Sequence, residues 1–325
     1  HGNKPFSEYR KYFFRYASEF GFQSFPSVKT LETVTDDPRE LNPFSYVVEK
    51  HQRNYGGNGK IAKYMQAAYR YPENFSDFVY ASQLLQADGI RYGVEHYRRN
   101  RGRCMGAIYW QLNDCWPVIS WSSIDYYGRW KALHYYAKRF FAPVMLSCEE
   151  QSWMTVEADM NRQHFEFEKS IRLNVTNETL DAHRVLVKWA VRKTDATILR
   201  EEEQWLEVPA LSAVWMDKVE LPQIDCFNEY VSYEAWENDQ IISQGTVIFS
   251  YPKYFHYLNP GLAVRVDGDE IVVKAEAYAK SVEIRNENDD LILEDNYFDM
   301  NAGEYRVKIL DGKPDGLKVR SVYDI

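Results

Sequence analysis

The chain has 325 residues, a length that predicts two or three domains rather than one. Its net charge of −9 argues against a nucleic-acid partner, which would need a basic face. No run of 18 apolar residues occurs, so no membrane partner is expected, and the four cysteines form no CxxC pair that would indicate a zinc or redox site.

Residues 1–146 mix strand and helix patterns. An apolar, aromatic run over 12–20 predicts a buried strand, and a short helical piece follows over 27–34. Longer helices are expected over 60–71, where Pro72 follows, and from an N-cap at Ser76 to about residue 99.

A second apolar run covers 104–110, and a last helix covers about 130–140. Both expected strands are apolar on both faces, as in a parallel sheet covered by helices. Polar residues follow each strand, at the end that holds the active site in (β/α) barrels. Only about two βα units are present, and a closed barrel needs eight, so this region is expected to be part of a barrel.

The period changes after residue 146, where alternating strands replace the mixed pattern. Residues 147–252 have the pattern of an immunoglobulin-like β-sandwich. Residues 253–325 predict a second, smaller sandwich, with a hairpin turn at Asp267-Gly268.

Three further features have a structural interpretation. The glycine-rich stretch 56–60 lacks the spacing of a phosphate loop and predicts a flexible surface loop. Cys104 and Cys148 lie in or beside apolar runs and are expected to be buried thiols. A basic cluster is expected to be solvated at the end of a helix; it consists of Arg98, Arg99, Arg101 and Arg103.

Glu19 is the first candidate for chemistry. It stands at the carboxyl end of a predicted strand, and Gly21 after it allows a close backbone approach. Retaining glycosidases need two carboxyl groups about 5–5.5 Å apart, a nucleophile and an acid/base. By position alone, Glu19 is equally compatible with a capping or salt-bridged carboxylate.

Two stretches carry a resemblance to a known family. SEFGFQSFPS at 18–27 resembles the nucleophile motif of β-mannosidases in glycoside hydrolase family two, and GAIYWQLNDCWP at 106–117 resembles their strand-eight motif. Residues 120–123 and 130–135 continue the match. HGNKPF at 1–6 is similar to the segment before the nucleophile strand, and residues 295–299 resemble the last sandwich of the family.

The resemblance implies the last two βα units of a (β/α)8 TIM barrel, followed by two immunoglobulin-like sandwiches. Glu19 would be the nucleophile that forms a glycosyl-enzyme. Trp110 would form the floor of the sugar-binding site. Asn113, Asp114 and Trp116 would lie in the loop after strand eight, as substrate contacts or as loop architecture.

The family's acid/base is a glutamate in an Asn-Glu pair at the end of strand four. No such pair precedes Glu19, and the later pairs, at 177–178, 228–229 and 286–287, fall in sandwich sequence. The sequence therefore predicts the C-terminal piece of a retaining exo-β-mannosidase that is inactive alone. The expected partner is a β-mannoside or related oligosaccharide, with no metal or organic cofactor, and a cytoplasmic location is slightly favoured over a secreted one.

Other functions stay open. Another family-two activity, such as β-galactosidase or exo-β-glucosaminidase, fits the same motifs. A non-catalytic carbohydrate-binding or scaffold module is the alternative from a different class, and it would need exposed coplanar rings on one sandwich face. Trp189 is in phase with the buried positions, and Trp236 is out of phase, but one exposed ring is not a platform.

Overall fold

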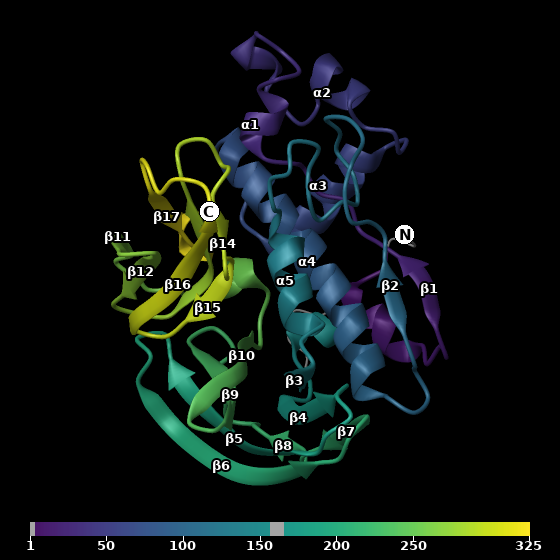
Figure 1. Cartoon of the computed structure of the whole chain (residues 1–325), viewed down its shortest axis with the longest axis vertical. Coiled ribbons are helices and arrows are strands. Elements are labelled where there is room, and N and C mark those ends of the chain that lie inside the picture. The colour runs from purple at the N-terminus through teal and green to yellow at the C-terminus, as the bar shows by residue number, and fades with distance from the viewer. Residues whose placement is uncertain (1–3, 157–165) are drawn as a thin grey trace.

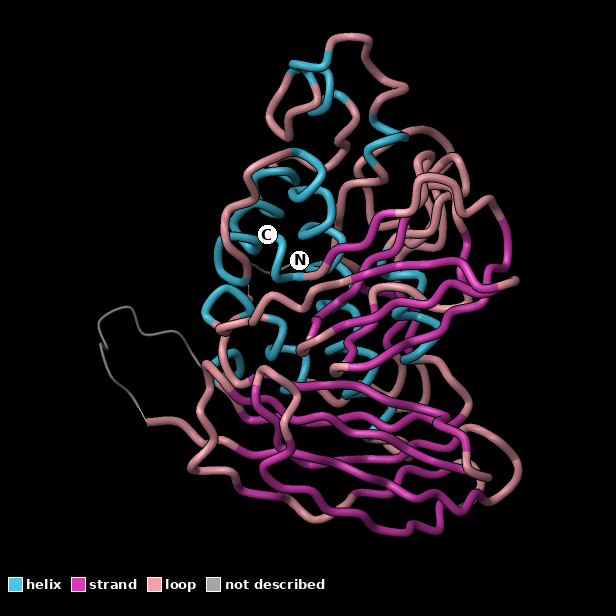
Figure 2. Tube along the Cα trace, turned by 90° about the vertical axis from the view of Figure 1, so that its left-hand side faces the viewer, coloured by secondary structure: helices cyan, strands magenta, loops and turns pink. Residues whose placement is uncertain are grey.

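The computed structural model describes residues 4–156 and 166–325, so the predicted similarity at His1 to Asn3 lies outside the described residues. A helix-rich unit occupies the upper and right part of Figure 1. One β-sandwich lies below it, and a second sandwich that ends in the C-terminus lies at its left side (Figure 1). Figure 2 shows the same separation between the helices and the two groups of strands.

The helix-rich unit contains one pair of parallel strands, β1 (Ala17–Phe20) and β2 (Ala107–Tyr109). The predicted strand over 12–20 is therefore right only in its last four residues. The residues before it are not buried; Tyr12, Phe13, Phe14 and Tyr16 are 43–55% exposed. The physical reason is that β2 pairs only with the end of the run, and no other described strand adjoins β1.

The same unit contains five helices within the described residues. They are α1 (Val28–Leu31), α2 (Tyr46–Lys50), α3 (Gly57–Ala68), α4 (Phe75–Arg99) and α5 (Ala132–Phe140), with 3₁₀ turns η1 (Phe6–Lys11) and η2 (Pro38–Glu40). The predicted loop at 56–60 is wrong. Gly56 takes φ +68° as the N-cap, and α3 starts at the next residue.

The N-cap of helix α4 is Asn74, two residues before the predicted Ser76, and its side chain accepts a hydrogen bond from the backbone amide of Asp77 at 3.0 Å. Of the basic cluster expected to be solvated, Arg98 and Arg99 are buried, Arg101 is half-buried, and Arg103 is exposed as predicted. Arg98 donates to the carbonyl oxygens of Phe140 and Ala142 at 2.6 and 2.8 Å, and Arg99 is 1% exposed. Arg98 thereby satisfies the carbonyls where α5 ends, and Arg99 donates to the carbonyl of Cys148 in β3 at 3.4 Å; neither contact can be predicted from the charge pattern of the sequence.

The first sandwich has two antiparallel sheets. One sheet has the order β3-β4-β7, with β8 also paired to β4, and the other has the order β10-β9-β5-β6. Their bounds are β3 (Val144–Gln151), β4 (Ser170–Asn177), β5 (His183–Lys193), β6 (Ile198–Val208), β7 (Ser212–Trp215), β8 (Val219–Glu220), β9 (Glu229–Glu237) and β10 (Gln240–Ile248), with the 3₁₀ turn η3 (Trp153–Thr155) after β3. Val185, Val187 and Trp189 are buried between the sheets, as the alternation predicted.

The second sandwich packs a sheet of order β11-β12-β16-β14 on one of order β15-β13-β17. Its elements are η4 (Pro252–Tyr254), β11 (Ala263–Asp267), β12 (Glu270–Ala275), β13 (Ala279–Arg285), β14 (Ile292–Leu293), β15 (Phe298–Met300), β16 (Gly303–Asp311), β17 (Lys318–Arg320) and η5 (Val322–Asp324). The predicted hairpin is confirmed, since Asp267 pairs with Glu270 and Gly268 has φ +65°.

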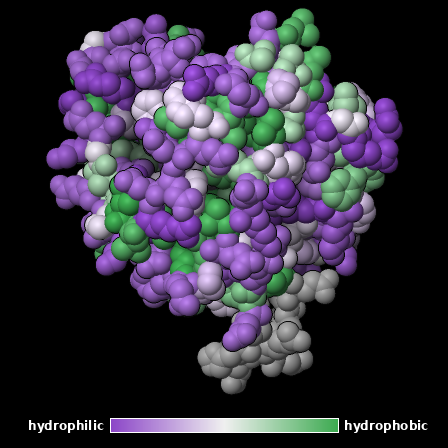
Figure 3. Space-filling view, turned by 90° about the horizontal axis from the view of Figure 1, so that it is seen from below, coloured by the Kyte–Doolittle hydropathy of each residue, from purple (hydrophilic) through white to green (hydrophobic). Residues whose placement is uncertain are grey.

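The surface at the sandwich end is mainly hydrophilic, with hydrophobic side chains in separate patches (Figure 3). Cys104 and Cys148 are buried free thiols, as predicted. Among the helices of the described residues, none combines the length and the apolar character needed to cross a membrane.

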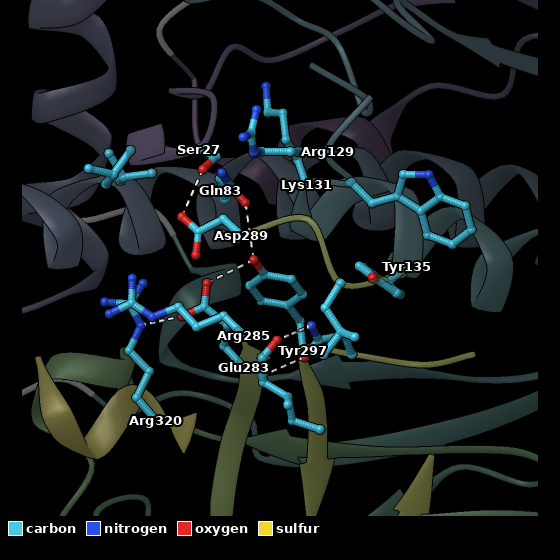
Figure 4. A pocket seen from close by; sticks show the side chains of 16 residues that line it. Ser27, Gln83, Arg129, Lys131, Tyr135, Glu283, Arg285, Asp289, Tyr297 and Arg320 are labelled. Carbon is cyan, nitrogen blue, oxygen red and sulfur yellow. Dashed lines mark hydrogen bonds and ion pairs between the residues drawn. The ribbon is translucent and has the colours of Figure 1, made fainter. Parts of the chain in front are cut away.

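A charged cluster joins the second sandwich to α4 (Figure 4). Arg320 forms an ion pair with Glu283 and donates to Asp77 at 2.9 Å, and its guanidinium lies 4.4 Å from the centre of the Tyr80 ring. Tyr297 donates to the other oxygen of Glu283 at 2.9 Å. Arg320 and Glu283 are almost buried, with side chains 13% and 9% exposed, so each depends on the other for compensation of its charge.

We expect Arg320→Ala to destabilise the chain by about 3–5 kcal/mol, because the substitution leaves Glu283 buried without its cation. Arg306→Ala is the matched control. This substitution also removes one positive charge, but the side chains of Arg306 and its partners Asp267 and Glu270 are 39–53% exposed. The loss of stability should therefore be less than about 1 kcal/mol. Urea unfolding of both variants measures the difference, and equal losses would contradict the assigned role of the cluster.

Candidate active site

The carboxyl ends of β1 and β2 meet at one edge. Ala17 pairs with Ala107 and Phe20 with Tyr109, and the amide of Trp110 donates to the carbonyl of Phe20 at 2.8 Å. The predicted nucleophile and the predicted floor of the sugar site are thus brought to the same end of two adjacent strands, as parallel pairing requires.

Some side chains of β1 and β2 pack against the helices, and others face the side of the strands that no helix covers. The ring of Phe20 lies against Gly93 of α4, where an added Cβ would be 2.6 Å from it, and the ring of Tyr109 lies against Phe140 of α5. Glu19 is exposed, and Trp110 is 49% exposed. The described residues provide no hydrogen bond or ion pair to the Glu19 carboxylate.

Gly21 permits the close approach of the two chains beyond the strands. An added Cβ would lie 2.4 Å from the carbonyl oxygen of Trp110 and 2.8 Å from the ring of Trp121. Only glycine fits between these atoms without displacing the backbone of Trp110. The sequence prediction of a close backbone approach after Glu19 is therefore confirmed.

The loop after β2 folds back on itself and is closed by Asp114. Its carboxylate accepts hydrogen bonds from Gln111 at 3.1 Å, from Ser120 at 2.9 Å and from Ser122 at 2.5 Å. The amide of Gln111 also donates to the carbonyl of Trp121 at 3.0 Å. These contacts give Asp114 an architectural role in this loop; its predicted contact with substrate stays a prediction.

Three polar side chains of α4 hold the loop after β1 from below. Ser82 accepts from the amide of Phe25 at 3.1 Å, and Gln83 donates to the carbonyl of the same residue at 3.1 Å. Gln86 accepts from the hydroxyl of Ser24 at 2.7 Å and donates to the carbonyl oxygens of Phe22 and Ser122 at 2.9 and 3.2 Å. One buried glutamine thereby fixes the loops after both strands relative to each other.

A buried lysine stands beside the same loop. Lys131 is 1% exposed, and its ammonium group donates to the carbonyl of Ser24 at 3.3 Å. Burial lowers the pKa of Lys131 to about 8, and the nearby carboxylates of Asp114 and Asp125 oppose that change.

The remaining predicted residues lie farther along the loop. Asn113 is exposed, and its carbonyl accepts from the side chain of Gln111 at 3.0 Å. Trp116 is half-buried; its ring stacks on His51 at 4.9 Å, and the guanidinium of Arg53 lies 4.8 Å from its centre. Trp116 therefore ties this loop to the segment after α2, and its role toward a sugar stays a prediction.

The sequence analysis did not identify the polar side chains of α4 that hold the two loops. Ser82, Gln83 and Gln86 are 0–4% exposed in the middle of a helix, yet the sequence analysis followed only the apolar face of that helix. A usable signal was present, because three polar residues within five positions interrupt the otherwise apolar stretch 78–87 of this helix. Such residues need buried partners, which are usually the backbone of a neighbouring loop.

The structure also places the three Asn-Glu pairs. Glu178 follows β4, Glu229 opens β9 and Glu287 follows β13, so all three lie in the sandwiches, as the sequence indicated. No group of three or more metal-ligating His, Cys, Asp or Glu side chains occurs among the described residues.

Comparison with known families identifies the two sandwiches. Residues 169–254 match the family described as the mannosidase Ig/CBM-like domain, and residues 257–325 match an Ig-fold domain family named for mannosidase. The two immunoglobulin-like sandwiches expected from the sequence are confirmed.

Curated relatives extend the similarity over nearly the whole chain. β-Mannosidase B of Thermothelomyces thermophilus is 30% identical over 337 aligned positions, which cover 95% of this chain and 39% of that protein. β-Mannosidase of Capra hircus is 39% identical over 144 positions, which cover 40% of this chain and 16% of that protein. The chain thus spans about two fifths of the length of the first of these relatives.

Solved structures agree. The β-D-mannosidase of Dictyoglomus thermophilum superimposes with a TM-score of 0.84 at 25% identity, covering 99% of this chain and 39% of that one. An exo-chitosanase of Amycolatopsis orientalis shares the fold with a TM-score of 0.67 at 15% identity, covering 98% of this chain and 45% of that one.

The strand pair, its helices and the two sandwiches therefore match proteins that are named as glycosidases. The resemblance of the sequence motifs is confirmed by these matches. Over nearly its whole length, the chain is similar to the C-terminal portion of the β-mannosidases of glycoside hydrolase family two.

We expect the stability of the chain to rise with pH across the window set by Lys131. The pKa of the lysine is about 8 in the folded state and 10.5 in its ordinary range, so between these values the unfolded chain binds more protons and alkali favours folding. Lys131→Met removes this contribution. Relative to the variant, the parent chain should gain on the order of 3 kcal/mol or less between pH 7.5 and 10.5 in urea unfolding, and parallel pH profiles would contradict the assignment.

Proposed function

We propose that this chain supplies the nucleophile side of the active site of a retaining exo-β-mannosidase. The observation that carries the proposal is the placement of Glu19 and Trp110 at the carboxyl ends of two adjacent parallel strands, on the side that the helices leave open. Barrel enzymes build their active sites at this end of the strands.

In this proposal the ionised Glu19 carboxylate attacks the anomeric carbon of a terminal β-mannoside. The bond to the leaving oxygen breaks as an acid/base carboxyl group, carried outside this chain, donates a proton to that oxygen. Water, deprotonated by the same group, then cleaves the glycosyl-enzyme and releases mannose with retained configuration. Trp110 offers its half-exposed ring to the apolar face of the sugar.

The exposed side chains on the strand pair are consistent with two strands of a larger barrel. Phe14, Met105 and Ile108 are 48–52% exposed on or beside β1 and β2, and a pair of strands is marginal as a separate sheet. We propose that the two strands are the last two of a (β/α)8 barrel, and that the isolated chain has no useful glycosidase activity because its acid/base partner is carried elsewhere.

A different sugar specificity is the second candidate for the complete protein. The exo-chitosanase likeness shows that the same fold occurs in an enzyme named for another substrate. An exo-β-glucosaminidase or β-galactosidase activity is therefore the alternative for the complete protein, and a panel of aryl glycosides separates it from β-mannosidase.

The test of the nucleophile uses the longer protein that contains this chain. Glu19→Gln should lower the turnover of an aryl β-mannoside by at least about 10³-fold, because covalent catalysis is lost. In Glu19→Ala, added azide should restore turnover and yield the α-mannosyl azide, since a small anion then attacks from the vacated face.

Two controls complete the design. Glu32→Gln changes an exposed glutamate paired with Lys29 and should leave turnover unchanged. Purified residues 1–325 should show no turnover that depends on Glu19. Turnover by the isolated chain that Glu19→Gln abolishes would overturn the need for a separate acid/base.

A further inference from the structure

A pocket lies where the helix-rich unit meets the first sandwich. Its walls come from η1, α3 and α4 on one side, and from η3, the end of β10 and η4 on the other. Its volume of about 380 Å³ falls within the range of about 300–1,000 Å³ that small-molecule sites usually have. No residue assigned above to the candidate active site lines this pocket, so its chemistry is independent of the proposed function.

The walls of the pocket are mainly aromatic and aliphatic. Phe6 stacks on Tyr64, with ring centres 5.4 Å apart and planes at 10°, and the ring of Tyr92 lies 6.4 Å from that of Phe6. Leu85 of α4 and Ile248 of β10, both 2% exposed, add aliphatic surface from the helices and from the sandwich. Such walls suit an aromatic ligand, because aromatic rings bury a large apolar area and pack on one another by face and edge.

The charged side chains on the inner walls are already paired. Three ion pairs account for them: Arg91 with Asp88 at 3.1 Å, Lys280 with Asp299 at 3.0 Å, and Arg10 with Glu150 at 2.6 Å. Because each of these carboxylates has its own cation, the inner walls add no net charge to the pocket.

The rim of the pocket, in contrast, carries unpaired positive charge. The exposed residues of the lining are Lys4, Pro5, Lys63 and Ala67. Within the part of the chain that the structure describes, neither lysine side chain forms an ion pair or a hydrogen bond, and the nearby carboxylate of Glu8 pairs with Lys11 at 2.9 Å. Two ammonium groups beside an apolar pocket attract an anion to its mouth.

We propose that this pocket binds a small organic anion with an aromatic body, of the class of the aryl carboxylates. The rings of Phe6 and Tyr64 pack on the aromatic body, and the ammonium groups of Lys4 and Lys63 bind the carboxylate at the rim. A sugar fits less well, because apolar walls leave its buried hydroxyl groups without partners. A cationic ligand meets two like charges at the mouth.

The place of the pocket in the fold gives binding a consequence for stability. A bound ligand contacts two helices and the first sandwich at once, and these surfaces come together only in the folded chain. A ligand that binds the folded chain alone raises the temperature of unfolding, by an amount that grows with ligand concentration.

The test compares three ligands of similar shape and different charge. The 325-residue chain is titrated by calorimetry with 2-naphthoate, 2-naphthamide and 2-naphthylmethylammonium. We expect 2-naphthoate to bind one to one and to raise the Tm. The neutral amide should bind about threefold more weakly or worse, and the cation about tenfold more weakly or worse, because each loses the attraction of the rim lysines.

Two pairs of variants of α3 locate the site. Ala67→Trp places a bulky ring at the mouth and should abolish binding, whereas Gln66→Trp changes the neighbouring exposed position, which does not line the pocket, and should bind as the parent does. Lys63→Glu should weaken the binding of 2-naphthoate by about fivefold. Lys60→Glu makes the same change of charge on the same helix outside the lining and should have little effect.

Three results would overturn the proposal: no binding of 2-naphthoate at millimolar concentration, equal binding of the three ligands, or binding that survives Ala67→Trp. Thermal unfolding without ligand shows whether each variant keeps its fold; if Ala67→Trp does not, Lys63→Glu and the three ligands decide. Glu19→Gln should leave the binding of 2-naphthoate unchanged, so failure of the glycosidase proposal and failure of this one are separate results.

Discussion

The burial of helix α4 is the constraint on which the other parts of the structure depend. The helix spans 25 residues, about 37 Å, and is covered along most of its length by β1, β2, α5 and both sandwiches. A helix buried on all sides must place each polar side chain against a partner. Near its start, Tyr80 donates to the carbonyl of Ser281 in the second sandwich, and at its end Arg98 binds the carbonyls that close α5.

The positions of the loops at the candidate site depend more on hydrogen bonds from α4 than on the pairing of β1 with β2. Two short strands provide few backbone hydrogen bonds, and among the described residues the loops that follow them pair only through isolated bridges, such as Ser24 with Ser120. The amide of Gln86 bridges the loops after β1 and β2 from within the helix, where it is fully buried. Its substitution would therefore be felt in the relative position of Glu19 and Trp110, although it contacts neither side chain.

Sequence patterns correctly predicted the elements whose conformation depends on neighbouring residues. They failed where the conformation or the burial depends on residues far away in the sequence. The Asp267-Gly268 hairpin and the alternation around Val187 depend on neighbouring residues and were correct. The expected exposure of Arg99 was wrong, because its partners Ser147 and Cys148 lie almost 50 positions away. The expected loop at 56–60 was wrong as well, because Gly56 acts as the N-cap of α3. For the site, the motifs identified Glu19 and Trp110, and the parallel pairing brought them together. The residues that hold their loops belong to α4, some 60 positions away in the sequence, which no local pattern links to them.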